Sequence, residues 1–320
     1  NHTRARAGSC SSARIHVMNL FKSFFNHNRT ESIVLIDIRN DSVAGACMHT
    51  KKGGVPVLVY TERISFSVRT DEPSEEAMLR ALETLGANLI REGAPALLRA
   101  TGSGRSNTIF VSIDGPWQKT SIRTERFERK DPFVLTKSMV ANVLDKDHSI
   151  PPEYVLVDQS IISAMLNGYG TRNPYGEKAR RADLLILNSF IAENVAESVS
   201  TMLRRLYHTD AILLLSGNSL RYQAMRVAFP HQRDAFIIDA VGLHTSIAMV
   251  RNDLFVFLAE MSDLYLKGTE WVQKISEEFT TLKDRYPLPQ TIFLIAQESD
   301  VSSLQKLLTT ANLNTLWFLN

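Results

Sequence analysis

Short apolar runs separated by turn residues dominate the chain, and two of these runs end in aspartate. Residues 32–38 (SIVLIDI) are apolar and β-branched, as in a short buried strand, and they carry Asp37 near their end. Residues 235–239 (AFIID) repeat this pattern and end in Asp239. Further strand-like segments follow both runs, so each aspartate is predicted to head a strand meander. These segments are residues 43–48, 55–60 and 64–68 in the first half, and 245–250 and 254–258 in the second.

Helical periodicity separates the strand-like segments. Apolar residues recur three and four positions apart over residues 73–92, and Glu75 and Glu76 lie in the first turn, where acidic residues are favourable. Similar spacing predicts helices at 137–145 (capped by Thr136), 192–207, 219–229 (capped by Ser219), 271–286 and 301–311. Other strands are expected at 108–113, 120–128, 153–162, 182–189, 211–215 and 291–295. The order predicts an α/β chain of two similar halves with a unit inserted between them.

Composition places the chain among ordinary globular proteins. It has 320 residues, 44% hydrophobic and 22% charged, which is more than one compact core usually holds. Two cysteines in a chain of this length indicate reduced thiols in a cytoplasm rather than a disulfide scaffold. No apolar run approaches the length of a membrane span. The net charge is +2, but five basic residues lie in the first 30, so the body is mildly acidic and nucleic acid is not an expected partner.

The first 30 residues divide into two parts. Residues 1–17 are rich in Arg and Ser and lack acids, and the first methionine is Met18, so we interpret 1–17 as a disordered leader or translated upstream sequence. Residues 18–25 (MNLFKSFF) contain four large apolar side chains. On a short helix they could contact a membrane surface or a partner. The favoured interpretation is that they tuck onto the domain.

The two aspartate-led turns are the best candidates for chemistry. Walker A, nucleophile-elbow and zincin motifs are missing from the sequence, and the eight histidines are dispersed. A carboxylate at a strand end can hold a hydrated Mg²⁺, and a following turn of small residues lets backbone N–H groups approach phosphate. The candidate binding residues are Asp37, Asn40 and Ser42 in the first turn, and Asp239, Gly242 and Thr245 in the second.

These turns make the chain resemble the FtsA/PilM branch of the actin-like superfamily over residues 31–311. Asp37 matches the first phosphate loop of that branch, Asp239, Gly242 and Thr245 match the second, and residues 291–304 match the adenosine-binding segment. The insert resembles the SHS2 module through residues 113–117, 132–136, 166–169 and 173–176 and through the helix after Ser189.

The resemblance implies an α/β, actin-like (ribonuclease H-like) duplicated fold with an inserted SHS2-type α+β domain and a reduced distal subdomain. The implied division is a leader, 1–30; a first actin-like part, 31–107; the SHS2-type domain, 108–208; a return to the first part, 209–232; and the second, reduced subdomain, 233–320.

At several positions the sequence departs from the family pattern in a way that weakens the expected nucleotide binding. Arg39 stands two residues after the first aspartate, where relatives normally place glycine, and Val241 and Leu243 replace glycines of the second loop. Ala296-Gln297 replace the paired glycines of the adenosine loop. A side chain at such positions blocks close backbone approach to phosphate. ATP and Mg²⁺, the metal held through water by Asp37 and Asp239, are therefore expected to bind weakly or not at all, and no residue is assigned as catalytic.

Three functions stay open at this point. By resemblance to FtsA, the chain would be a non-catalytic scaffold of bacterial cell division that links the tubulin-like protein FtsZ to the membrane and self-associates through its insert. The alternative is a PilM-like platform of type IV pilus or type II secretion assembly, which binds an inner-membrane assembly protein. The third is a weak actin-fold ATPase or kinase. Each implies a cytoplasmic protein, and the first two place it at the inner face of the cell membrane.

Overall fold

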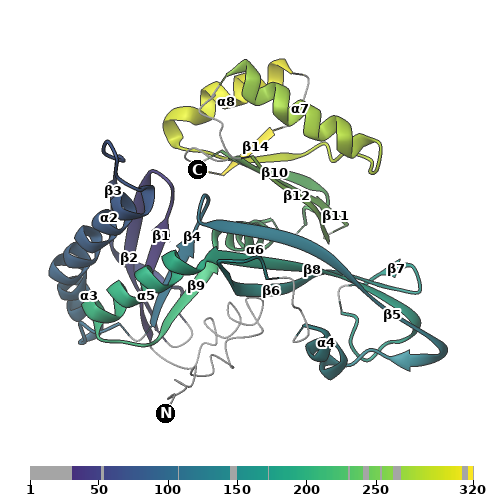
Figure 1. Cartoon of the computed structure of the whole chain (residues 1–320), viewed down its shortest axis with the longest axis horizontal. Coiled ribbons are helices and arrows are strands. Elements are labelled where there is room, and N and C mark those ends of the chain that lie inside the picture. The colour runs from purple at the N-terminus through teal and green to yellow at the C-terminus, as the bar shows by residue number, and fades with distance from the viewer. Residues whose placement is uncertain are drawn as a thin grey trace, which may run out of the picture.

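A computed structural model gives the arrangement of the chain. It describes residues 31–51, 54–106, 108–144, 150–171, 173–229, 231–240, 245–252, 254–261, 268–311 and 316–319. These residues form three sheets, of which two belong to the two halves and the third extends away from them (Figure 1).

The first sheet has the strand order β3-β2-β1-β4-β9. β1 pairs antiparallel with β2 and parallel with β4, and β4 pairs parallel with β9. Its strands are β1 (Glu31–Ile38), β2 (Ser42–Thr50), β3 (Val57–Ser65), β4 (Thr108–Ile113) and β9 (Ile212–Ser216). Successive side chains of a strand point to opposite faces. Val34, Ile36 and Ile38 therefore share one face of β1, where they are buried against helices.

Four helical segments cover that face: α2 (Ser74–Asn88), the π-helical turn η1 (Leu89–Gly93), α3 (Ala94–Thr101) and α5 (Glu193–Tyr207). The first three form a continuous path that runs past the predicted end at residue 92. Pro95 does not end this path because it lies in the first turn of α3, where a missing N–H costs little.

The second sheet repeats the first, with the order β12-β11-β10-β13-β14 and the same sequence of antiparallel and parallel pairs. Its strands are β10 (Ala235–Asp239), β11 (Thr245–Arg251), β12 (Leu254–Met261), β13 (Ile292–Ile295) and β14 (Leu316–Leu319), of which β14 was not predicted. Helices α7 (Thr269–Lys283) and α8 (Glu298–Thr310) cover one face. Tyr222 and Met225 of α6 (Gly217–Ala228) pack on the other face together with Ile162 and Leu187 of the third sheet. The chain is thus a duplicated α/β protein, as the sequence predicted.

The third sheet is antiparallel and has the order β5-β8-β6-β7. It consists of β5 (Gln118–Val134), β6 (Tyr154–Leu166), β7 (Tyr169–Gly170) and β8 (Lys178–Ala192), with α4 (Lys137–Leu144) packed on it. β5 is longer than predicted because its register shifts between Glu128 and Phe133, which lets the strand continue past Pro132. β8 ends at Ala192 and α5 begins at Glu193, so this sheet passes directly into the helical layer of the first.

Two elements do not lie where the predicted division put them. The segment 108–113 was expected to open the inserted domain, but as β4 it lies between β1 and β9 in the first sheet. The helix α5, assigned to the insert as well, packs on the first sheet through Val195, Val199 and Leu203. Parallel pairing joins segments far apart in sequence, so strand periodicity alone does not reveal it. The domain limits and the SHS2 assignment of the insert stay predictions.

We expect Leu82→Ala to lower the free energy of unfolding by about 2–5 kcal/mol, because Leu82 is fully buried between α2 and the first sheet. Leu98→Ala is the matched control, since Leu98 lies in the same helical path but is 53% exposed. Urea denaturation of both variants checks this. Equal losses would contradict the placement of α2 against the sheet.

Candidate functional site

The first predicted aspartate is paired with arginines of its own sheet. Asp37 Oδ2 lies 2.7 Å from Nε of Arg39, at the end of β1, and 3.7 Å from Nη2 of Arg63, on β3. Arg63 also donates through Nη1 to Oγ of Ser42 at 2.9 Å. Arg39, which stands where the family pattern has glycine, thus supplies a cation to the carboxylate that was expected to hold metal.

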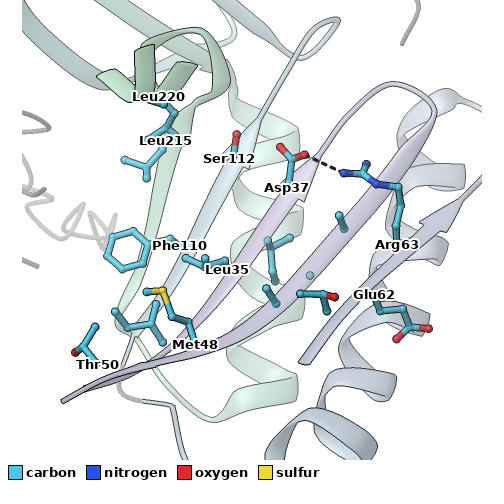
Figure 2. Close-up of a pocket in the computed structure, with 17 residues that line it drawn as sticks. Leu35, Asp37, Met48, Thr50, Glu62, Arg63, Phe110, Ser112, Leu215 and Leu220 are labelled. Atoms are coloured by element: carbon cyan, nitrogen blue, oxygen red, sulfur yellow. Dashed lines mark ion pairs between the residues drawn. The ribbon is translucent and has the colours of Figure 1, made fainter. Parts of the chain in front are cut away.

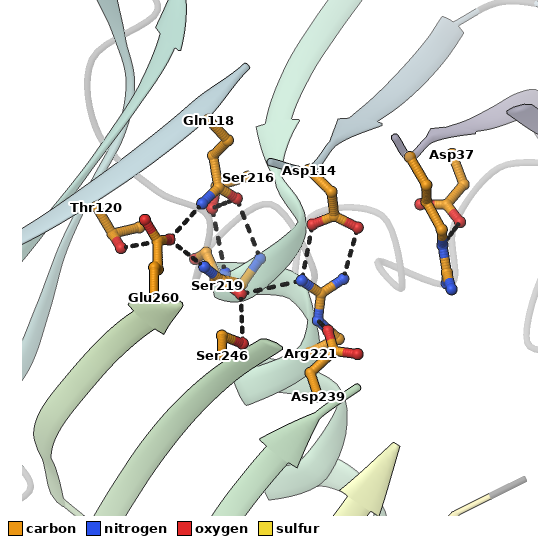
Figure 3. A network of polar contacts seen from close by, with 12 residues as sticks. Asp37, Asp114, Gln118, Thr120, Ser216, Ser219, Arg221, Asp239, Ser246 and Glu260 are labelled. Carbon is orange, nitrogen blue, oxygen red and sulfur yellow. Dashed lines mark hydrogen bonds and ion pairs between the residues drawn. The ribbon is translucent and has the colours of Figure 1, made fainter. Parts of the chain in front are cut away.

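The second aspartate lies at the junction of the two halves, where Arg221 of α6 reaches it (Figure 3). Asp239 ends β10 and is buried, and its Oδ2 forms an ion pair with Nε of Arg221. The two terminal nitrogens of the guanidinium bind Asp114, which follows β4. Nη1 donates to Oδ2 of Asp114 at 2.9 Å, and Nη2 donates to Oδ1 at 2.7 Å. One side chain therefore joins the strand ends of both halves.

Charge keeps this arginine protonated. Burial alone would lower the pKa of Arg221, but the carboxylates of Asp114 and Asp239 outweigh it and hold the pKa above the ordinary value, with a further contribution from Asp37. The cluster of strand-end carboxylates is thus neutralised from within the chain.

The start of α6 is built to bring Arg221 into place. Ser216 caps the helix, and its Oγ accepts a hydrogen bond from the backbone N of Ser219 at 3.3 Å. The prediction of Ser219 as the cap is wrong, because the helix begins at Gly217, two residues earlier than expected. A Cβ at Gly217 would clash with Oδ1 of Asp114 and lie 2.9 Å from Nη1 of Arg221. The ion pair therefore depends on glycine at this position.

A second group of polar side chains extends from the same helix turn toward β12. Oε1 of Glu260 accepts hydrogen bonds from Nε2 of Gln118 and Oγ1 of Thr120, both at 2.9 Å, and from Nδ2 of Asn218. Oδ1 of Asn218 accepts from Nη2 of Arg221 at 2.9 Å and from Oγ of Ser246 at 3.1 Å. The junction thus ties the third sheet, α6 and the second sheet into one hydrogen-bonded network.

Two carboxylates in this region have raised pKa values. Burial raises the pKa of Glu260, and the hydrogen bonds from Thr120 and Asn218 offset only part of that effect. Burial likewise raises the pKa of Asp158 on β6, against hydrogen bonds from Ser219 at 2.8 Å and Ser160 at 3.2 Å. Because these pKa values differ between the folded and unfolded chain, proton binding to either carboxylate changes the free energy of unfolding.

Among the other site residues that the sequence predicted, Ser42 and Thr245 form hydrogen bonds with residues other than Arg221. Asn40 lies in the turn between β1 and β2, and Ser42, which begins β2, donates to Oδ1 of Asp41 at 2.9 Å. Thr245 begins β11, and its Oγ1 accepts a hydrogen bond from Nε1 of the buried Trp271 at 2.9 Å. Gly242 lies outside the described residues. The structure brings Asp239 together with Asp114 through Arg221, whereas Asp37 contacts arginines of its own sheet.

Sequence reasoning missed Asp114, Arg221 and Glu260. Asp114 entered the sequence analysis only within residues 113–117 of the SHS2 resemblance. Its position after a strand parallel to β1 is the signal that could have marked it as a third strand-end carboxylate. Arg221 on a helix and Glu260 on a strand follow an ordinary surface pattern, and only the tertiary structure places them at the junction.

These contacts do not suit a bound Mg²⁺-nucleotide. Each carboxylate expected to hold the metal is already paired with a guanidinium, and a second cation beside it would be repelled. Among the described residues, no group of three or more His, Cys, Asp or Glu side chains is placed to hold a metal ion. The roles assigned to Asp37, Asn40, Ser42, Asp239, Gly242 and Thr245 stay predictions.

Comparison with known proteins identifies the fold. No family model matches the sequence, and no curated protein matches it. The chain is similar in structure to a Bacteroides thetaiotaomicron protein of actin-like ATPase fold and unknown function, with 10% identity, 91% of both chains covered and a TM-score of 0.51. It is also similar to a chain of the PilM–PilN type IV pilus biogenesis complex, with 13% identity, 90% of this chain and 88% of that chain covered, and a TM-score of 0.54. The predicted actin-like fold is therefore confirmed. At such identities the likeness shows the fold alone, and it does not single out FtsA.

Replacement of Arg221 by methionine is expected to lower the free energy of unfolding by about 3–5 kcal/mol, because Asp114 and Asp239 lose the guanidinium that neutralises them. Chemical denaturation of the variant and the wild type measures this loss. Arg204→Met is the control, because Arg204 pairs with an almost fully exposed Asp210 and should contribute under about 1 kcal/mol. Similar losses in the two variants would contradict a stabilising role for the contact of Arg221 with Asp114 and Asp239, which we call the Arg221 clamp.

Glu260 should make stability depend on pH. Its folded-state pKa lies above the unfolded value of 4.5, so the folded chain binds the proton more tightly, and stability present below that value is lost as pH rises through the folded pKa. Glu260→Gln retains an acceptor but does not titrate. We therefore expect the unfolding free energy of Glu260→Gln, relative to wild type, to increase with pH above 4.5. A difference that stays constant with pH would rule out this linkage.

Proposed function

We propose that this protein is a non-catalytic scaffold of the actin-like fold, in which the side chain of Arg221 takes the place of a nucleotide at the junction of the two halves. The observation that carries the proposal is the bidentate contact of Arg221 with Asp114 and its ion pair with Asp239. A nucleotide with its metal would need those carboxylates, and the guanidinium already holds them. The protein would then act by binding other proteins.

The assembly that it serves has two candidates. One is bacterial cell division, with FtsZ as partner, and the other is a PilM-like platform that binds an inner-membrane assembly protein. The likeness to a chain of the PilM–PilN complex supports a protein partner in a membrane assembly. Titrating the purified chain with the FtsZ tail and with the cytoplasmic segment of a PilN-type protein would discriminate between the two candidates.

The proposal places the protein in the cytoplasm, in contact with a membrane-bound assembly. The described helices are all too short or too polar to cross a bilayer. Self-association through the third sheet is part of the proposal, because β5 lies at the edge of that sheet and an edge strand has backbone groups available for pairing.

The scaffold proposal predicts that isothermal titration with Mg²⁺-ATP gives no saturable binding up to millimolar concentrations, and that Asp239→Ala leaves this unchanged. Asp234→Ala is a matched control, because Asp234 precedes the same strand at its other end and pairs with Arg251 at the surface. Micromolar binding that is abolished by Asp239→Ala but not by Asp234→Ala would overturn the proposal in favour of an ATP-binding protein.

A further inference from the structure

The first sheet has one face with little helical cover. Helices α2, α3 and α5 cover the face that carries Val34 and Ile36, whereas Ile33, Leu35 and Phe110 point to the other side. Among the described residues, the helical cover on that side comes from α6, through Leu220 and Ala224. Parallel strands are normally covered by helices on both faces. The second sheet meets this condition, with α7 and α8 on one face and α6 with the third sheet on the other.

A cavity of about 750 Å³ lies on this less covered face. Its walls are mainly apolar and come from β1, β2, β4, β9 and α6, and β3 adds the polar side chains of Thr61, Glu62 and Arg63. Figure 2 shows Phe110, Met48 and Thr50 toward one end, and Asp37 and Ser112 toward the other. The polar groups therefore lie near the ends and along the β3 side, and the part of the cavity over β1 and β4 suits an apolar occupant.

The size of the site matches one helix. The four strands β2-β1-β4-β9 span about 14 Å across the sheet at the usual strand spacing. A helix with its side chains is about 10–12 Å in diameter. A short helix with large apolar side chains on one face would thus provide the second layer that the sheet lacks.

The sequence holds such a segment just before β1. Residues 18–25 carry Leu20, Phe21, Phe24 and Phe25, whose spacing puts all four on one side of a helix. Residues 1–30 lie outside the described part of the chain. Because β1 begins at Glu31, the connection from Phe25 to the sheet spans six residues and can reach about 20 Å when extended, enough to return over the start of β1.

We propose that residues 18–25 dock in this cavity as an internal cover for the first sheet. The phenylalanine rings would then pack on Phe110, Leu215 and Met48, whose thioether makes favourable contacts with aromatic rings. While docked, these side chains are withheld from a membrane or a partner. The proposal does not rest on the scaffold function, because it uses the apolar part of the cavity and not the ion pairs of Arg221.

Photo-crosslinking in the full-length chain tests this directly. With p-benzoylphenylalanine in place of Phe24, irradiation should give crosslinks within one molecule to peptides that contain Met48, Phe110 or Leu215. The same probe in place of Lys22, which lies away from the apolar side, should lose most of these crosslinks. Ala46→Trp fills the cavity and should also remove most of the crosslinking from position 24, with its unfolding transition measured alongside.

A second variant keeps the proposal testable if Ala46→Trp fails to fold. The double substitution Phe21→Ser with Phe24→Ser leaves the cavity intact and should raise the fluorescence of the dye ANS severalfold. Crosslinks that join two molecules, or that fall outside the cavity walls, would overturn the proposal. So would an unchanged dye signal, or full-length protein that sediments with anionic phospholipid vesicles through Phe21 and Phe24 while no crosslink maps to the cavity.

Discussion

The guanidinium of Arg221, held between Asp114 and Asp239, is the interaction on which the relation of the two halves depends. It connects the end of β4 in the first sheet with the end of β10 in the second. The helix that carries it also contributes Tyr222 and Met225 to the core beneath the second sheet. Electrostatic pairing and apolar packing therefore act through the same helix, and neither half can shift without disturbing both.

Such a clamp has a thermodynamic character different from that of a ligand. A buried ion pair gains little net stability over apolar side chains, because desolvation opposes the attraction between the charges. Its value lies in geometry, since a planar guanidinium that binds one carboxylate with two hydrogen bonds fixes orientation as well as distance. An internal clamp is also present at all times, whereas a bound nucleotide comes and goes. The actin-like fold alone does not decide between these cases, because one fold can host many functions.

Much of the fold could be predicted from sequence because it follows local periodicity. The strands that end near Asp37 and at Asp239, and the repeated meander, are visible in the alternation of apolar and turn residues. What the sequence hides is set by contacts between distant segments. The sheet to which residues 108–113 belong and the role of Arg221 both depend on parallel pairing and helix placement. The incorrect cap at Ser219 has a local cause, because serine is an equally good cap at positions 216 and 219 and the sequence does not show at which of them the helix begins.

The junction between β8 and α5 has a mechanical consequence. β8 is paired on both sides, with β5 and with β6, and the next residue after it begins a helix that packs on the first sheet. Because no loop residue separates β8 from α5, a displacement of the strand could not be absorbed in a linker and would reach the helical layer of the first half.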